Sequence, residues 1–239
     1  MIQLDKYTTK ARLYPSFLVL LPAFILGLFY VTDIEKYYHY ITVIFSYSLF
    51  SFLISQLGRD KGKLKEADLF VYFGGKPTTQ ILRHDNDYLD RVTKERYHRL
   101  LSNLITGLRM PTSVQEANDS KYADEVYESC AKYLISNTRD TKKFNLLFKE
   151  NINYGFRRNL WGMKTWALCF LLLCFILHLF MVSNYFTNFY KIDIKDILPF
   201  VIIFIIALFW IFIVTRNWVK IPAYAYAERL YESLNVLSN

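Results

Sequence analysis

Glycine is scarce in this chain, and histidine and cysteine are scarcer still, with 8, 4 and 3 residues respectively. No two cysteines form a Cys-x-x-Cys pair, and Cys169 and Cys174 lie five positions apart within a long uncharged stretch, so the sequence predicts no metal site. It also lacks the Gly-x-Ser-x-Gly pattern of hydrolytic enzymes. We therefore expect no catalytic residues, no cofactor and no enzymatic activity.

Charge is missing from four long stretches of a chain that is 53% hydrophobic. Each stretch reaches or approaches the roughly 20 residues that a helix needs to cross a bilayer. The stretches are Leu13–Thr32, Tyr37–Leu57, Thr165–Tyr190 and Ile197–Thr215. They predict four transmembrane helices arranged as two hairpins. The first is expected to be retained, because no small-residue cleavage pattern follows it and a second span comes at once.

Lysine and arginine gather in three places: the N-terminal tail, the long segment between the hairpins and the final tail. The first short connection, residues 32–38, has one lysine against two acidic residues, and the second, residues 191–196, has two of each. The positive-inside rule then places both termini and the middle segment in the cytoplasm. The middle segment carries most of the net charge of +8. Attraction to anionic lipid explains the basic residues next to the membrane, but explains those further along the segment less well.

The predicted fold class is a mainly α membrane protein whose two transmembrane hairpins flank a mostly helical cytosolic domain. We expect a tail and first hairpin over residues 1–57, a ligand-binding domain over 58–160, a second hairpin over 161–218 and an amphipathic helix over 219–239. The alternating run at residues 68–73 predicts one strand without an identified partner. Asp90 is the expected cap of one helix, and Ser113 with Glu116 has the spacing of a capping box that opens a helix to Ser136.

The stretch DLFVYFGGKPTTQILRHDND, residues 68–87, resembles an anion-binding turn. Two glycines permit positive φ and a close backbone approach, and Pro77 suits the first turn of a helix, whose N-terminus attracts oxyanions. The alternative is an ordinary tight turn with a solvated lysine. The candidate ligand-binding residues in this stretch are Gly74, Gly75, Lys76, Thr78, Thr79, Arg83 and His84.

A second basic element follows in the sequence DRVTKERYHRLL. Lys94, Arg96 and Arg99 share a predicted helix that also carries tyrosine. Cations for phosphates and aromatic rings for bases are what a single-stranded nucleic acid requires. The alternative is a solvated helical face.

The second span carries small hydroxyl residues on one face, among them Thr42, Ser48 and Ser55. Such residues line water-filled pores, and they also allow helices to pack closely. We therefore hold these three residues as candidates for a pore wall, with helix packing as the alternative.

Four spans with a cytosolic insert, together with one motif, resemble the membrane effector of a bacterial anti-phage defence system of the Hailong type. The motif residues are Gly74, Gly75, Pro77, Thr78, Thr79, Leu82, Arg83, His84, Thr93, Lys94, Arg96, Tyr97 and His98. The resemblance implies a pore-forming homo-oligomer, a tetramer, in the bacterial inner (plasma) membrane. It also implies a nucleotidyltransferase-like partner enzyme whose DNA oligomer holds the pore closed.

The sequence thus leads to two hypotheses. In the first, the chain is an ion channel gated by a DNA oligomer or a nucleotide bound to its basic cytosolic domain. In the second, it is a membrane anchor that recruits a cytosolic partner protein and forms no pore.

Overall fold

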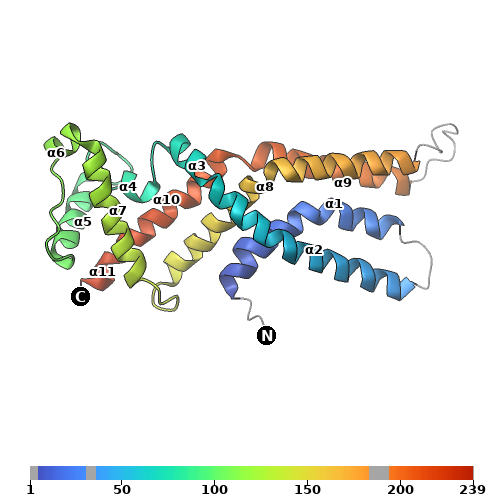
Figure 1. The fold of residues 1–239 in the computed structure, drawn as a ribbon, viewed down its shortest axis with the longest axis horizontal. Helices are drawn as coiled ribbons and strands as arrows, with labels where there is room; N and C mark the ends of the chain where they lie inside the picture. The colour runs from blue at the N-terminus through green and yellow to red at the C-terminus, as the bar shows by residue number, and fades with distance from the viewer. Residues whose placement is uncertain (1–4, 31–35, 183–193, 239) are drawn as a thin grey trace. The chain divides into compact units, whose positions relative to one another are not determined.

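The computed structural model describes residues 5–30, 36–182 and 194–238, and every regular element among them is helical (Figure 1). Two stretches have the wider π-helical winding, Thr8–Leu13 and Phe209–Ile213. The α-helices are α1 (Tyr14–Tyr30), α2 (Lys36–Leu64), α3 (Glu66–Phe73), α4 (Pro77–Gln80), α5 (Arg91–Leu104), α6 (Ser113–Asn118), α7 (Ser120–Asn137), α8 (Asn145–Val182), α9 (Ile194–Leu208), α10 (Arg216–Glu232) and α11 (Leu234–Leu237).

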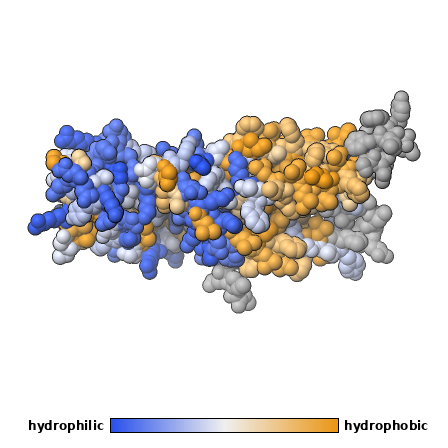
Figure 2. Space-filling model, turned by 45° about the horizontal axis from the view of Figure 1, so that its top comes forward, coloured by the Kyte–Doolittle hydropathy of each residue, from blue (hydrophilic) through white to orange (hydrophobic). Residues whose placement is uncertain are grey.

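Within the described residues, four helical stretches are long and apolar enough to cross a membrane. They are Thr8–Tyr30, Tyr40–Gln80, Asn145–Val182 and Asp196–Ile213. Figure 2 shows hydrophobic surface gathered over these helices. The four stretches follow the order of the predicted spans and fit a multi-pass membrane protein. Both predicted short connections fall largely outside the described residues, as does the end of the predicted third span.

The chain divides into two compact units. Unit 1 comprises Met1–Glu66 and Gly155–Val219, and unit 2 comprises Ala67–Tyr154 and Lys220–Asn239. These divisions lie near the boundaries predicted after residues 57, 160 and 218, but do not coincide with them. The difference arises because α2 and α8 continue as helices beyond the apolar stretches that define the spans.

Helices α2 and α8 of unit 1 meet almost backbone to backbone at two glycines. A Cβ atom added to Gly162 would lie 2.7 Å from both the Cα and the N atom of Gly62. Close to this crossing, the buried side chain of Asn159 donates from Nδ2 to the carbonyl oxygen of Ala11 at 2.7 Å. Small residues therefore bring these helices close enough for a buried amide to reach a third segment.

His178 joins three helices of unit 1. Its Nε2 lies 2.9 Å from the carbonyl oxygen of Asp196, which can only accept a hydrogen bond. Its other ring nitrogen, Nδ1, lies 2.5 Å from the hydroxyl of Tyr30, with which it shares a hydrogen bond. One imidazole in α8 thus satisfies polar groups from α1 and α9, where few water molecules would be available to do so.

Unit 2 includes the C-terminal helices. Leu230 and Leu234, from the predicted apolar stripe, are fully buried. The hydroxyl of Tyr231 donates to the carbonyl oxygen of Thr78 at 2.7 Å, and the Tyr97 and Tyr231 rings stack with centroids 6.2 Å apart. The amphipathic tail therefore packs in the same unit as the predicted anion-binding stretch.

The strand predicted at residues 68–73 is wrong, because these residues belong to helix α3. Leu69 and Phe73 are its buried residues, and they lie four positions apart on one helical face. Val71 and Tyr72 are exposed. A run as short as residues 68–73 fits both the two-residue period of a strand and the 3.6-residue period of a helix. Tertiary packing decides between the two, and here it favours the helix.

The capping box lies one residue earlier than predicted. Thr112 accepts from the backbone N–H of Gln115 at 3.3 Å, and the Gln115 side chain returns to the Thr112 N–H at 3.0 Å. The predicted single helix to Ser136 is also interrupted at Asp119, which caps α7 by accepting from the Tyr122 N–H at 2.9 Å. Asp119 can do so because its carboxylate competes for the backbone donors of the next turn.

Candidate ligand-binding site

The twin glycines form the C-terminal cap of helix α3. Gly74 has φ 83° and Gly75 has φ 143°. The Gly74 N–H donates to the carbonyl oxygen of Val71, and the Gly75 N–H donates to that of Phe70 at 2.8 Å. This pairing is the Schellman motif, which ends helices at a glycine with positive φ. Both glycine N–H groups are thus taken up by the backbone. Pro77 opens α4 at its first position, as predicted.

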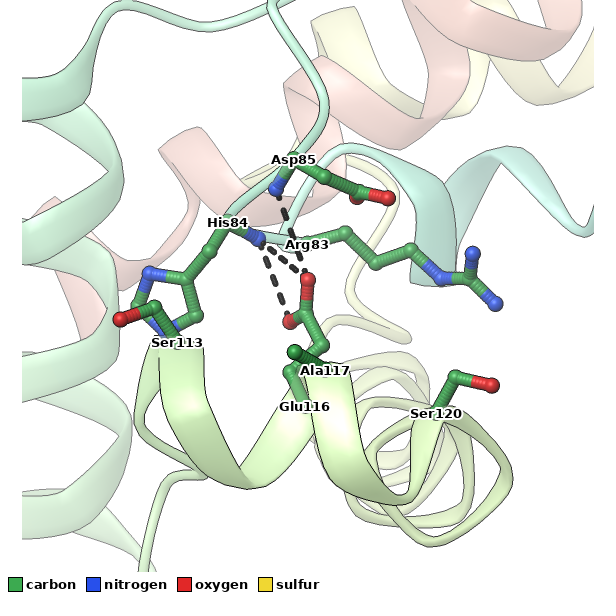
Figure 3. Close-up of a pocket in the computed structure, with 7 residues that line it drawn as sticks. All are labelled: Arg83, His84, Asp85, Ser113, Glu116, Ala117 and Ser120. Atoms are coloured by element: carbon green, nitrogen blue, oxygen red, sulfur yellow. Dashed lines mark hydrogen bonds between the residues drawn. The ribbon is translucent and has the colours of Figure 1, made fainter.

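A few residues later, the backbone does bind a negatively charged group, which is the side-chain carboxylate of Glu116. The carboxylate of Glu116 accepts from the backbone N–H of His84 at 2.9 and 3.2 Å and from that of Asp85 at 3.4 Å (Figure 3). The hydroxyl of Tyr127 also donates to it at 2.5 Å. Glu116 is only 6% exposed. These three donors replace the water that its charge loses on burial.

Two further carboxylates, both on α7, hold the cationic side chains of the same stretch. Arg83 donates to Asp124 from Nε at 2.8 Å and from Nη2 at 2.5 Å, a two-point contact that raises the pKa of Arg83. Lys76 donates to Glu128 at 2.7 Å. Hydrogen bonds from Lys76, and then from Lys132, lower the pKa of Glu128.

Three carboxylates from α6 and α7 therefore contact residues 76–85. The donors in this stretch comprise an ammonium group, a guanidinium group and two backbone N–H groups, which are the groups that proteins use to bind phosphate. The binding of an external anion by this stretch stays a prediction. In the structure, the anions that occupy it are Glu116, Asp124 and Glu128.

A cavity of about 530 Å³ lies beside these contacts. Its size falls within the range of small-molecule sites. The lining residues are Arg83, His84, Asp85, Ser113, Glu116, Ala117 and Ser120 (Figure 3). Two serine hydroxyls and an arginine can meet a polar ligand there, whereas Asp85 and Glu116 bring negative charge. An anionic ligand would have to compensate for those carboxylates or displace them.

The other predicted site residues take several different positions. Thr79 is buried and donates to the carbonyl oxygen of Lys76 at 2.8 Å, whereas Thr78 is half-buried. Lys94 is 6% exposed, and its ammonium group contacts the backbone carbonyl oxygens of Asn86 and His84. Lys94 therefore holds the loop after Arg83 from within the unit.

Arg96 and Arg99 are exposed on α5, and neither lines the cavity. The Arg96 guanidinium lies 5.4 Å from the centre of the Tyr97 ring. Of the predicted ligand-binding residues, Arg83 and His84 thus line the cavity, while these two arginines form a separate solvent-facing basic group.

Two histidines pack together at the cavity, and one of them, His84, lines it. The rings of His84 and His98 lie 4.9 Å apart, and Nε2 of His98 donates to the carbonyl oxygen of Leu82 at 2.8 Å. Nε2 of His84 lies 2.9 Å from the carbonyl oxygen of Pro111. Burial lowers the pKa of His98. Both rings thus satisfy backbone carbonyls and fix the loop that carries the cavity residues.

Sequence reasoning missed the acidic half of this site. Asp124 and Glu128 are spaced four apart on a predicted helix, which places both carboxylates on one face. That spacing was an available signal for a partner to the basic stretch. Glu116 was assigned to a capping box, and no local pattern marks Tyr127 as its hydrogen-bond donor.

The three candidates for a pore wall satisfy their hydroxyls within their own helix. Thr42 donates to the carbonyl oxygen of Tyr38 at 2.7 Å, Ser48 to that of Ile44 at 2.8 Å and Ser55 to that of Phe52 at 2.6 Å. Ser55 is buried, whereas Thr42 and Ser48 are exposed. Such bonds suit a helix in lipid and a helix beside water equally, so their role in a pore remains a prediction.

No family model, curated protein or solved structure matches this chain. Across residues 5–30, 36–182 and 194–238, no three histidine, cysteine or acidic side chains gather closely enough to hold a metal ion. The function must therefore be argued from the four spans and from the chemistry of residues 76–85.

Proposed function

We propose that this protein is a ligand-gated membrane effector whose unit 2 binds a phosphate-bearing ligand, either a DNA oligomer or a nucleotide. The observation that supports the proposal is the set of donors in residues 76–85. Lys76, Arg83 and the N–H groups of His84 and Asp85 all bind carboxylates. A carboxylate and a phosphate accept hydrogen bonds from the same partners, so a phosphate can compete for them.

The competition gives binding a mechanical consequence. A phosphate that takes Arg83 from Asp124, and Lys76 from Glu128, frees α7 from this stretch. Ligand binding then favours one arrangement of unit 2 over another, as gating requires. The exposed Arg96 and Arg99 supply further cationic contacts for a longer nucleic acid, with binding that weakens steeply as salt rises.

Two further parts of the proposal come from the residues themselves. The distribution of lysine and arginine places both termini and unit 2 in the cytoplasm, and the hydroxyl face of α2 contributes to the pore wall. The rest comes from the resemblance to anti-phage effectors of the Hailong type. The chain forms a homo-oligomeric ion channel, a tetramer, in the bacterial inner membrane, and a nucleotidyltransferase-like enzyme supplies the ligand. The ligand changes the open fraction of the pore.

The binding step is tested with full-length protein in detergent. Nucleic acid that co-purifies is identified, and the affinity for a labelled short oligodeoxynucleotide and for ATP is measured against salt. Arg83→Gln should weaken binding about tenfold, in line with the loss of one charged hydrogen-bonding partner. Asp124→Asn should strengthen it, because the competing carboxylate is gone. Glu125→Gln, an exposed change on the same helix, should leave affinity unchanged.

The gating step is tested by ion flux from liposomes that contain the pure protein, with and without the oligodeoxynucleotide. Flux that depends on ligand, and that shifts with Arg83→Gln, supports the channel. Liposomes that stay ion-tight in both states, together with unchanged binding by Arg83→Gln and Asp124→Asn, would overturn the proposal. That result would favour a membrane anchor for a cytosolic partner protein instead.

A further inference from the structure

Two hollows on the surface of unit 1 share three lining residues and together form one groove. Their volumes are about 540 and 200 Å³. The shared residues are Leu20 of α1, Ile54 of α2 and Phe170 of α8. The larger hollow extends to Gly27 and Thr42, and the smaller one to Lys61 and Trp166. The groove therefore follows three of the helices that can cross a membrane.

The groove is apolar along its length and cationic at one end. Apart from Thr42, Ser46 and the hydroxyl of Tyr47, its walls are hydrocarbon, thioether, ring or glycine until Lys61 is reached. A rise of about 1.5 Å per residue places Lys61 about 10 Å along α2 from Ile54. A surface hollow of this kind on spanning helices faces acyl chains, and its cationic end lies at the depth of lipid headgroups.

The Lys61 ammonium group lacks an acidic partner among the residues that the structure describes. Its Nζ lies 5.7 Å from the centre of the Trp166 ring. The neighbouring carboxylates are paired elsewhere: Asp60 contacts Arg59 at 2.9 Å, and Glu66 contacts Arg158 at 2.8 Å. Lys61 therefore offers its charge to an external anion at the mouth of an apolar groove, next to an aromatic ring typical of membrane interfaces.

We propose that this groove binds one anionic phospholipid, with the lipid phosphate at Lys61 and one acyl chain between α1, α2 and α8. The lipid supplies the two things that the groove lacks: a negative charge at one end and a flexible hydrocarbon chain along the rest. A zwitterionic lipid fills the groove but gains less at Lys61, and a soluble phosphate gains nothing along the apolar walls. The proposal does not depend on the nucleic-acid site of unit 2.

The test uses full-length protein in detergent, titrated with phosphatidylglycerol or phosphatidylcholine that carry the same acyl chains. Native mass spectrometry counts bound lipid, and tryptophan fluorescence follows thermal unfolding of unit 1, which holds all 4 tryptophans. We expect phosphatidylglycerol to bind more tightly and to raise the unfolding midpoint further. Glycerol 3-phosphate, which has no acyl chain, should change neither measurement.

Two matched pairs of variants locate the lipid. Lys61→Gln should weaken phosphatidylglycerol binding about fivefold, the equivalent of about 1 kcal/mol for one basic residue at a charged membrane surface. Lys63→Gln removes the same charge from an exposed position outside the groove and should have no such effect. Leu57→Trp fills the groove and should weaken the binding of both lipids. Leu53→Trp, which lies outside the groove, should not.

The proposal is overturned if the two lipids bind equally well, if both lysine variants lose affinity to the same extent, or if glycerol 3-phosphate matches phosphatidylglycerol. Unchanged lipid binding by Leu57→Trp would overturn it as well. None of these results bears on nucleic-acid binding by unit 2, so the two proposals can fail separately.

Discussion

The carboxylate of Glu116 accepts hydrogen bonds from the backbone N–H of His84 at 2.9 and 3.2 Å. The two residues are 32 positions apart, so the contact closes a long loop. Tyr127 completes the arrangement from α7, and burial together with its bond to Glu116 raises the pKa of its hydroxyl. The hydroxyl therefore stays protonated and keeps donating. A buried carboxylate with three donors fixes the loop that carries Arg83.

Glu116→Ala should release that loop. The His84 and Asp85 N–H groups would lose their acceptor, and an unmet buried polar group costs about 1–3 kcal/mol. Hydrogen exchange followed by mass spectrometry should show residues 84–86 exchanging about 5–150 times faster, as those energies imply. Glu116→Gln keeps one acceptor oxygen and should show a smaller increase.

Glu125→Ala is the matched control for this change, because Glu125 is an exposed acidic residue on α7. Its replacement should leave exchange of residues 84–86 unchanged, since surface substitutions usually alter stability by less than about 0.5 kcal/mol. If both variants speed exchange equally, Glu116 does not hold the loop.

Arg83 and Asp124 should be energetically coupled. Their two-point contact is partly buried, with side chains 21% and 35% exposed. A double-mutant cycle of Arg83→Ala and Asp124→Ala should therefore give a coupling of about 1–2 kcal/mol, measured by hydrogen exchange across α7. The more exposed pair of Lys76 and Glu128 should give at most about 1 kcal/mol. Coupling near zero for Arg83 and Asp124 would contradict the proposed function, in which a ligand phosphate competes with Asp124 for Arg83.

Local chemistry explains which parts of this fold follow from the sequence. Asp90 caps α5 by accepting from the Thr93 N–H at 2.8 Å, as predicted, because a cap needs only residues three positions apart. The four spans follow equally from composition, since a long uncharged run has few other stable environments. Pro77 starts α4 for a similar local reason.

The candidate site could not be predicted in the same way, because its partners are distant in sequence. Arg83 and Asp124 are 41 positions apart, and no short pattern specifies that they meet. The capping box uses Thr112 and Gln115, one residue earlier than predicted. Glu116 is therefore not part of the cap and instead accepts from the His84 N–H. The two periodicities of residues 68–73 likewise depend on which side chains become buried, and tertiary packing decides that.

Gly162→Ala should destabilise unit 1. The added Cβ would lie 2.7 Å from two backbone atoms of Gly62, which cannot move aside as a side-chain end can. Overpacking of this kind costs about 1–3 kcal/mol, so the unfolding midpoint followed by tryptophan fluorescence should fall by several degrees.

Gly27→Ala is the control, since its Cβ would meet only the side chain of Val43, at 3.3 Å. Alanine also favours the helix over glycine by about 1 kcal/mol, so this variant should unfold at the same temperature or slightly higher. If the unfolding midpoint falls equally in Gly162→Ala and Gly27→Ala, the crossing of α2 and α8 does not require glycine.

His98 should make unit 2 less stable as pH falls. Burial lowers its pKa below the usual histidine value of about 6.5, so the unfolded chain binds a proton at a higher pH than the folded chain does. Stability is therefore retained above about pH 6.5 and is lost as pH falls from there through the lowered pKa of the folded state. The neighbouring His84, Lys94 and Glu116 remain in place in the variant that tests this.

His98→Gln keeps an N–H that can donate to the carbonyl oxygen of Leu82, but it cannot titrate. Hydrogen-exchange protection of unit 2, corrected for the intrinsic pH dependence of exchange, should fall between pH 7.5 and 5 in the natural protein. The fall should be smaller in His98→Gln, whereas His84→Gln should retain it. The same loss of protection in His98→Gln and in the natural protein would assign the pH dependence to other groups. The substitution removes one titrating group, the imidazole of His98, so a pH dependence that depends on this imidazole must become smaller in the variant.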